Sequence, residues 1–138
     1  MGGRLLVLLW VSACSSGLHG GPSQNEAVAR VGRKESFRAQ MTAATFCTKC
    51  GRDAPVTLEF GTPAKVKVTI PTCYAHAKSK IGDHDNWQIA FVEGGVAATA
   101  GELDIVDCTS KHVTGTLWAT FPDNRRVEAE IDTELKEP

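Results

Sequence analysis

The sequence lacks most of the patterns by which an enzyme or a nucleic-acid-binding protein is recognised. It contains no glycine-rich phosphate loop, no serine in the setting of a nucleophile, and no pair of carboxylates in a context that suggests catalysis. No basic run is interleaved with aromatic residues, which weighs against nucleic-acid binding. The apolar run from Leu5 to Val11 is too short for a membrane span, which needs about twenty apolar residues. We therefore expect a non-enzymatic protein that binds no nucleic acid.

The overall composition is that of an ordinary globular domain. Hydrophobic residues make up 42% of the 138 residues and charged residues 22%, which is too apolar a balance for a disordered chain. The net charge is −1, but residues 30–80 hold ten basic and three acidic residues, whereas residues 81–138 hold four basic and twelve acidic ones. Because these charges alternate with apolar residues, we interpret them as solvated strand faces that offset each other. An interaction surface is the alternative.

The first fourteen residues have the pattern of an export signal. Arg4 supplies a positive charge, Leu5 to Val11 is apolar, and two small residues precede Cys14. The tetrapeptide Val11-Ser12-Ala13-Cys14 resembles the lipobox of bacterial lipoproteins. This resemblance implies that Cys14 receives a diacylglycerol on its sulfur and becomes the first residue of the mature protein. Several acyl chains on one residue would make a stable membrane tether.

These patterns predict how the chain is divided and where the protein is located. We expect a signal peptide over residues 1–13, a flexible lipid-anchored linker over residues 14–30, and one β-rich domain over residues 31–138. Ser15 follows the cysteine, in place of the Asp that resembles an inner-membrane retention signal, so the outer membrane is expected in a Gram-negative cell. A simple secretory signal, giving a secreted protein, is the alternative.

From about Phe37 the apolar residues recur with a period of two, which predicts β-strands. The stretches with this pattern are Val56–Phe60, Val66–Ile70, Trp87–Phe91, Leu103–Val106, Val113–Phe121 and Val127–Asp132. Turn signals separate them at Gly61–Ala64, at Gly94-Gly95 and at Pro122–Asn124. The pattern favours an all-β fold, a small antiparallel β-sandwich or barrel of about seven to eight strands. Only Glu26 to Ala43 leaves room for a short helical turn.

The stretch Val113–Phe121 predicts one buried and one partly wet strand face. Alternate residues from Val113 onward, including Gly115, are expected to point into the core. Trp118 and Thr120 lie on the other face and are candidates for a binding surface. A single aromatic residue at such a position is more usually half-buried packing.

The five cysteines favour structural disulfides. Setting Cys14 aside for lipid leaves Cys47, Cys50, Cys73 and Cys108, an even number of the kind that two disulfides use in an exported protein. The sequence does not choose among the three pairings. Each bridge would stabilise the domain by about 2–4 kcal/mol.

Zinc binding is the sharper alternative for the same residues. The segment around Cys47 and Cys50 resembles a zinc knuckle, and Cys73 with His76 has the Cys-x-x-His spacing of a second ligand pair. Cys108 is a further candidate ligand. An oxidising envelope consumes thiols, which weighs against metal.

Two further interpretations remain open. The Cys47/Cys50 pair is also compatible with thiol-redox work, although no helix pattern follows it to lower a thiol pKa. The polar loop Asp83–Asn86 could ligate a cation, but such loops are more often plain turns. We expect no cofactor and a binding or structural role at the membrane surface, with an envelope protein as the partner.

Overall fold

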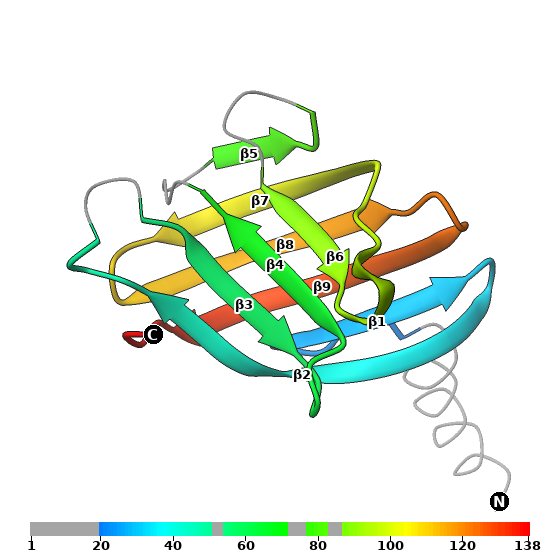
Figure 1. Cartoon of the computed structure of the whole chain (residues 1–138), viewed down its shortest axis with the longest axis horizontal. Coiled ribbons are helices and arrows are strands. Elements are labelled where there is room, and N and C mark those ends of the chain that lie inside the picture. Colours follow the sequence, from blue (N-terminus) through cyan, green and yellow to red (C-terminus); the bar gives the residue numbers. More distant parts are fainter. Residues whose placement is uncertain (1–19, 51–53, 72–76, 83–86) are drawn as a thin grey trace, which may run out of the picture.

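The computed structural model describes residues 20–50, 54–71, 77–82 and 87–138, and nine strands in these residues form one antiparallel sheet (Figure 1). The strands are β1 (Glu26–Val31), β2 (Lys34–Phe46), β3 (Val56–Phe60), β4 (Val66–Ile70), β5 (Ala77–Lys80), β6 (Gln88–Phe91), β7 (Ala100–Cys108), β8 (His112–Thr120) and β9 (Arg125–Glu134). Their order in the sheet is β5-β7-β8-β9-β1-β2-β3-β4-β6. The predicted all-β fold is confirmed, with nine strands in place of about seven to eight.

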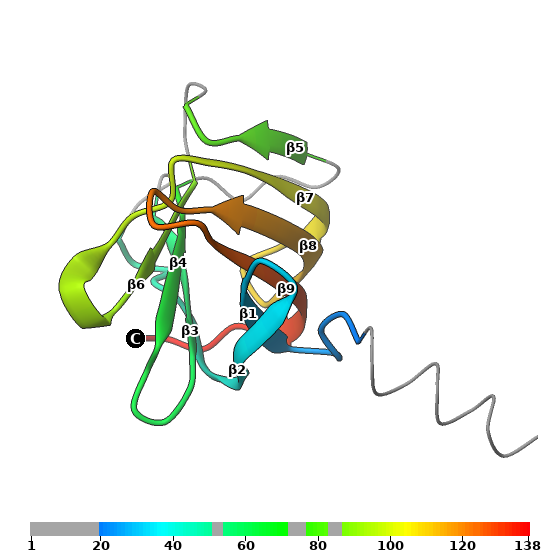
Figure 2. The ribbon, with the colours of Figure 1, turned by 90° about the vertical axis from the view of Figure 1, so that its right-hand side faces the viewer.

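The sheet curls into a half-barrel, and β2 forms its corner. The first half of β2 pairs with β1, and the second half pairs with β3 after a register shift between Met41 and Ala43. An irregularity of this kind bends a strand and increases its twist. As a result β3, β4 and β6 cross over the layer of β7, β8 and β9 (Figures 1 and 2). The side chain of Thr42 supports the corner, since its hydroxyl donates to the carbonyl of Gly61 at 2.9 Å.

The core lies between these two layers. In β3, β4, β6 and β8 every second residue is buried, as expected where one face of a sheet is buried and the other is wet. The largest fully buried side chains are Trp87, Phe60, Leu58, Ile89, Ile131, Val28, Val56, Val66, Val68, Val113 and Val127. The predicted inward set of the Val113–Phe121 stretch is confirmed, because Val113, Leu117, Ala119 and Phe121 are at most 4% exposed.

Two contacts join parts of the half-barrel that the strand order leaves apart. Trp87, directly before β6, donates its indole N–H to the carbonyl of Ser79 in β5 at 3.1 Å, so one side chain links the two end strands of the sheet. At the other side, the chain after β9 reaches the second half of β2. There the amide of Phe46 donates to the carbonyl of Lys136, and the amide of Lys136 donates to the carbonyl of Ala44.

The segment Glu26–Ala43 differs from the sequence-based expectation. It forms β1 and most of β2, with no helical turn, and residues 26–30 of β1 fall in the stretch 14–30 expected to be a flexible linker. Ala27 and Ala29 point into the core and are fully buried, while Val28 is fully buried on the opposite face. Alanine fits close to neighbouring strands but has a low strand propensity, so its alternation carried little signal.

Most of the other expected strands and turns are confirmed. The structure adds β5, which no pattern predicted. The expected Gly94-Gly95 turn follows β6, and its glycines have positive φ angles of 79° and 62°. Positive φ is the conformation that glycine adopts without steric cost. The only helical element among the described residues is the 3-10 turn η1 (Glu93–Gly95), and none of them forms a helix able to cross a bilayer.

Candidate binding face

The outer surface of β7, β8 and β9 carries an exposed aromatic residue among acidic ones. It consists of the outward-pointing side chains of three strands, which we call the Trp118 face: Glu102 and Asp104 from β7, Thr114, Thr116 and Trp118 from β8, and Arg126, Glu128, Glu130 and Asp132 from β9. Trp118 is 36% exposed. The predicted wet side of β8 is thereby confirmed. In Figure 2 this layer lies to the right of β3, β4 and β6, so its outer face points away from them.

Strand register places the carboxylates in rows across this face. Trp118 pairs with Glu102 on one side and Glu128 on the other. Thr116 pairs in the same way with Asp104 and Glu130. Neighbouring strands are about 4.8 Å apart and alternate residues about 7 Å apart, so the Cα atoms of the four acidic residues frame a rectangle of about 10 by 7 Å. Trp118 and Thr116 lie at the midpoints of its two longer sides.

Two adjoining hollows run along this face. The first, of about 320 Å³, is lined by Trp118 and the four framing carboxylates, with Pro22 at its edge. The second, of about 210 Å³, continues past Thr116 and Glu130 to Thr114 and Asp132, with Gln24 at its edge. Since both share Thr116 and Glu130, they form one shallow trough.

The negative charges in the trough are only partly neutralised. Lys78 Nζ lies 3.8 Å from Glu102 Oε1 and 3.9 Å from Asp104 Oδ2, and two arginines, Arg30 and Arg126, each lie 3.4 Å from Glu128 Oε1. Exposed pairs of this kind contribute about 0–1 kcal/mol each.

Glu130 forms no ion pair among the described residues, and Asp132 is engaged by His112, whose Nε2 is 2.6 Å from Oδ1. Lys80, which is opposite Glu102 in the register of β5 and β7, is a fourth cation beside the face, so the five carboxylates exceed the cations around them by one.

The ring of Trp118 already carries a cation. The guanidinium carbon of Arg126 lies 4.8 Å from the ring centroid. A cation over an indole ring is attracted by the negative face of the π system. Thr120, the other predicted candidate, is half-buried at the end of the strand, beside Arg126 in the register.

The three described cysteines, Cys47, Cys50 and Cys108, are not part of this face. Cys47 and Cys50 are joined to each other, with Cα atoms 5.3 Å apart, in the exposed turn after β2. Glu137 holds this turn, because its carboxylate accepts hydrogen bonds from the amide and the hydroxyl of Thr48. Cys108, at the end of β7, is also disulfide-bonded.

The other sequence-based site predictions cannot be placed. Cys14, Cys73, His76 and Asp83–Asn86 all lie outside the described residues. Within the described ranges no three His, Cys, Asp or Glu residues come together as metal ligands. A cysteine in a disulfide has no thiolate to offer zinc, so the Cys47/Cys50 pair would need reduction before it could bind metal.

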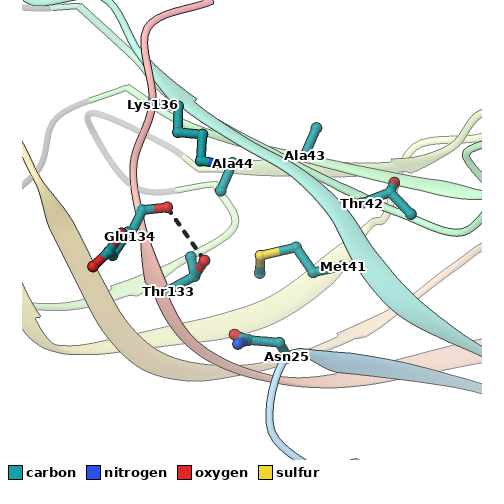
Figure 3. Close-up of a pocket in the computed structure, with 8 residues that line it drawn as sticks. All are labelled: Asn25, Met41, Thr42, Ala43, Ala44, Thr133, Glu134 and Lys136. Atoms are coloured by element: carbon teal, nitrogen blue, oxygen red, sulfur yellow. Dashed lines mark hydrogen bonds between the residues drawn. The ribbon is translucent and has the colours of Figure 1, made fainter.

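A further hollow, of about 200 Å³, lies beside the corner of β2 (Figure 3). It opens where β1 begins, because β1 fills the space between β9 and β2 only from Glu26 onward. Met41 points into it, and its polar edge is occupied: the side-chain amide of Asn25 exchanges two hydrogen bonds of 2.7 Å with the backbone of Asp132. We interpret this hollow as a consequence of strand geometry.

The largest hollow described, of about 470 Å³, lies at one end of the half-barrel. Two of its cations rest on rings that form its wall: Lys65 lies 5.2 Å from the centroid of Phe37, and Arg125 lies 3.6 Å from that of Phe91. Arg125 is also bonded to Asp123 at 2.7 Å. These cations are already engaged, which makes the Trp118 face the better candidate.

Comparison with protein-family models, curated proteins and solved structures finds no match to this chain. The candidate face therefore rests on its own geometry. Sequence reasoning named Trp118 and Thr120 but missed the carboxylates around them. The signal was present as acidic residues at every second position, in Glu102/Asp104 and in Glu128/Glu130/Asp132, but it could not show that the two runs flank one strand.

Proposed function

We propose that this protein is an exported lipoprotein, anchored by lipid on Cys14, whose β-domain is a non-enzymatic binding module of the cell envelope. The observation that carries the binding role is the Trp118 face, where an exposed ring and partly neutralised carboxylates lie on a sheet of paired strands. Side chains on paired strands are held in fixed relative positions, which suits recognition.

The start of the folded part supports a short tether. The carbonyl of Gly20 accepts hydrogen bonds from Arg30 at 2.6 Å and from Arg38 at 2.8 Å, so the chain is attached to the outer side of β1 and β2 from this residue onward. Fully extended, the chain from Cys14 to Gly20 spans about 20 Å at about 3.5 Å per residue. A lipid on Cys14 would therefore keep the domain close to the membrane surface.

Membrane fractionation tests the anchor. In a bacterial host, the full-length chain is expected in the membrane fraction and Cys14→Ala in the soluble fraction. Ser15→Ala is the matched control, and it should fractionate as the unchanged protein. Mass spectrometry of the N-terminal peptide should show acyl chains on Cys14. If Cys14→Ala remains in the membrane fraction, the lipid anchor is wrong.

A second candidate function is thiol–disulfide exchange at Cys47–Cys50, favoured by the exposure of this bond. Cys50 and the two residues between the cysteines are exposed. A thiolate of a partner dithiol would attack one sulfur and release the other as a thiolate. The partner's second thiolate would then free the reduced pair and leave the partner oxidised.

Mild reduction tests the exchange reaction. Brief treatment of the folded protein with dithiothreitol, followed by alkylation, should label Cys47 and Cys50 and leave Cys108 unlabelled. Labelling of Cys47 and Cys50 only after unfolding would show the bond to be structural. Zinc content of the reduced protein would test the metal alternative in the same sample.

A further inference from the structure

We propose that the Trp118 face binds a basic peptide segment, rich in lysine or arginine and in extended conformation, supplied by another envelope protein. This inference rests on the proposed binding function and names its partner class. It does not depend on the lipid anchor.

The first support is charge. The carboxylates of Glu102, Asp104, Glu128, Glu130 and Asp132 project from one face. The cations beside them are Arg126, Lys78, Arg30 and Lys80, which is opposite Glu102 in the register, so the carboxylates outnumber the cations by one. The contacts of Lys78 are long, at 3.8 and 3.9 Å, and its side chain is 61% exposed. Glu130 has no ion-pair partner in the part of the chain that the structure describes, and Lys78 approaches Glu102 and Asp104 only at long distances, so an incoming cation can reach these carboxylates. A polyanion such as a nucleic acid would be repelled.

The second support is the indole ring. Arg126 over Trp118 shows that the ring accepts a guanidinium in this environment. Arg126 is itself only 3.4 Å from Glu128, so it can keep that partner if a ligand cation takes its place over the ring. A lysine or arginine placed between the ring and a carboxylate gains both cation–π and charge-assisted contacts.

The third support is spacing. Glu128 and Glu130 are alternate residues of β9, and Glu102 and Asp104 are alternate residues of β7. Their side chains repeat at about 7 Å, which is also the repeat of alternate side chains in an extended peptide. A peptide along the trough can therefore present basic residues at positions i and i+2 to two carboxylates of one strand. A helix, whose neighbouring side chains are three or four residues apart, does not match this repeat as directly.

Fluorescence anisotropy of labelled peptides tests the proposal. The protein is the chain from residue 14 with Cys14→Ala, which is unlipidated and contains every described residue. The probe is an eight-residue peptide that alternates lysine and threonine. We expect it to bind, with an affinity that falls as salt is raised. A peptide with glutamate in place of lysine should not bind, and one with the same lysines in a single block should bind several-fold more weakly.

Variants of the face and a matched control locate the site. Trp118→Thr should weaken binding by about tenfold, which corresponds to about 1.4 kcal/mol of cation–π and contact energy. Glu130→Gln should weaken it about threefold. Glu59→Gln removes a carboxylate from the outward side of β3 in the opposite layer, and it should leave binding unchanged. Circular dichroism should show all three variants folded.

Several outcomes would overturn the proposal. These are equal affinity for the lysine and glutamate peptides, equal loss in Glu59→Gln and Glu130→Gln, and full binding by Trp118→Thr. Self-association of the free protein that is lost in Trp118→Thr would instead assign the face to a second copy of the chain. All of these measurements are made without lipid, so a failure of the Cys14 anchor would leave them intact, and their failure would leave the anchor intact.

Discussion

At the residue scale, Arg125 links the core to the surface. Its guanidinium lies 3.6 Å from the ring centroid of Phe91, and its Nε donates to Asp123 Oδ2 at 2.7 Å. The backbone amide of Arg125 donates to the other carboxylate oxygen of Asp123 at 3.2 Å. One side chain thus covers an aromatic core residue and fixes the turn between β8 and β9.

This contact predicts a lowered pKa for the carboxyl group of Asp123. The side-chain hydrogen bond from Arg125 lowers the pKa of Asp123 below its ordinary value of 3.8. Since the folded-state pKa is depressed, the stability linked to Asp123 is present above about pH 3.8 and is lost as the pH falls below it. Titration followed by carboxyl-carbon NMR should show the low pKa, and Arg125→Gln should raise it. An unchanged pKa in that variant would show that the hydrogen bond is not the cause.

A second prediction at the residue scale concerns Gly115. It lies on the inner face of β8, as its sequence position predicted, and a Cβ there would come 2.5 Å from the backbone oxygen of Asp104. Backbone cannot move aside as a flexible side chain can, so Gly115→Ala should lower the free energy of unfolding by about 1–3 kcal/mol. Urea denaturation measures this. Gly21→Ala, where a Cβ meets no atom within 4 Å, should change stability by less than about 0.5 kcal/mol.

At the scale of elements, strands with bulky alternating residues were predictable and strands with small or charged ones were not. Val66–Ile70 alternates valine and isoleucine with lysine and threonine, and β4 has these bounds. β1 alternates alanines with Glu26, Val28 and Arg30. Glu26 and Val28 lie on its outer face, where they are covered: Val28 is fully buried, and Glu26 bonds to Arg38 and Gln40. The burial of these two side chains depends on tertiary contacts, which the local sequence pattern of β1 does not show.

The pairing of β5 with β7 predicts the second disulfide. Cys108 ends β7 and is disulfide-bonded, and with Cys47 and Cys50 bonded to each other the remaining cysteines are Cys14 and Cys73. Ala77, the first residue of β5, is opposite Ile105, so the chain enters β5 near the end of β7 that carries Cys108. Cys73 precedes β5 by only four residues. We therefore expect a Cys73–Cys108 bond.

Peptide mapping under non-reducing conditions tests this pairing. It should find Cys73 linked to Cys108 and Cys47 linked to Cys50. The full-length chain should leave Cys14 outside every disulfide. A Cys14–Cys108 link would contradict both this pairing and the lipid anchor, because one sulfur cannot carry both bonds.

At the scale of the whole molecule, the fold was more predictable than the candidate site. Period-two patterns indicate strands one at a time, and each can be found locally. The Trp118 face needs the order β7-β8-β9 and its register, which bring Glu102 and Glu128 to opposite sides of Trp118. These acids are 26 residues apart in the sequence, and no local pattern relates them. The uneven charge of the two halves of the sequence predicted strand faces that offset each other. In the structure an acidic excess remains on the layer of β7, β8 and β9.

The closure of the half-barrel gives the last prediction, because the two end strands of the sheet meet at Trp87. Its indole is 1% exposed and donates to the carbonyl of Ser79. Trp87→Phe would remove this hydrogen bond and leave a gap, lowering the free energy of unfolding by about 1–3 kcal/mol in denaturant titrations. Trp118→Phe, at an exposed position, is the control and should change it by less than about 0.5 kcal/mol. Equal effects of the two substitutions would mean that Trp87 does not hold the ends of the sheet together.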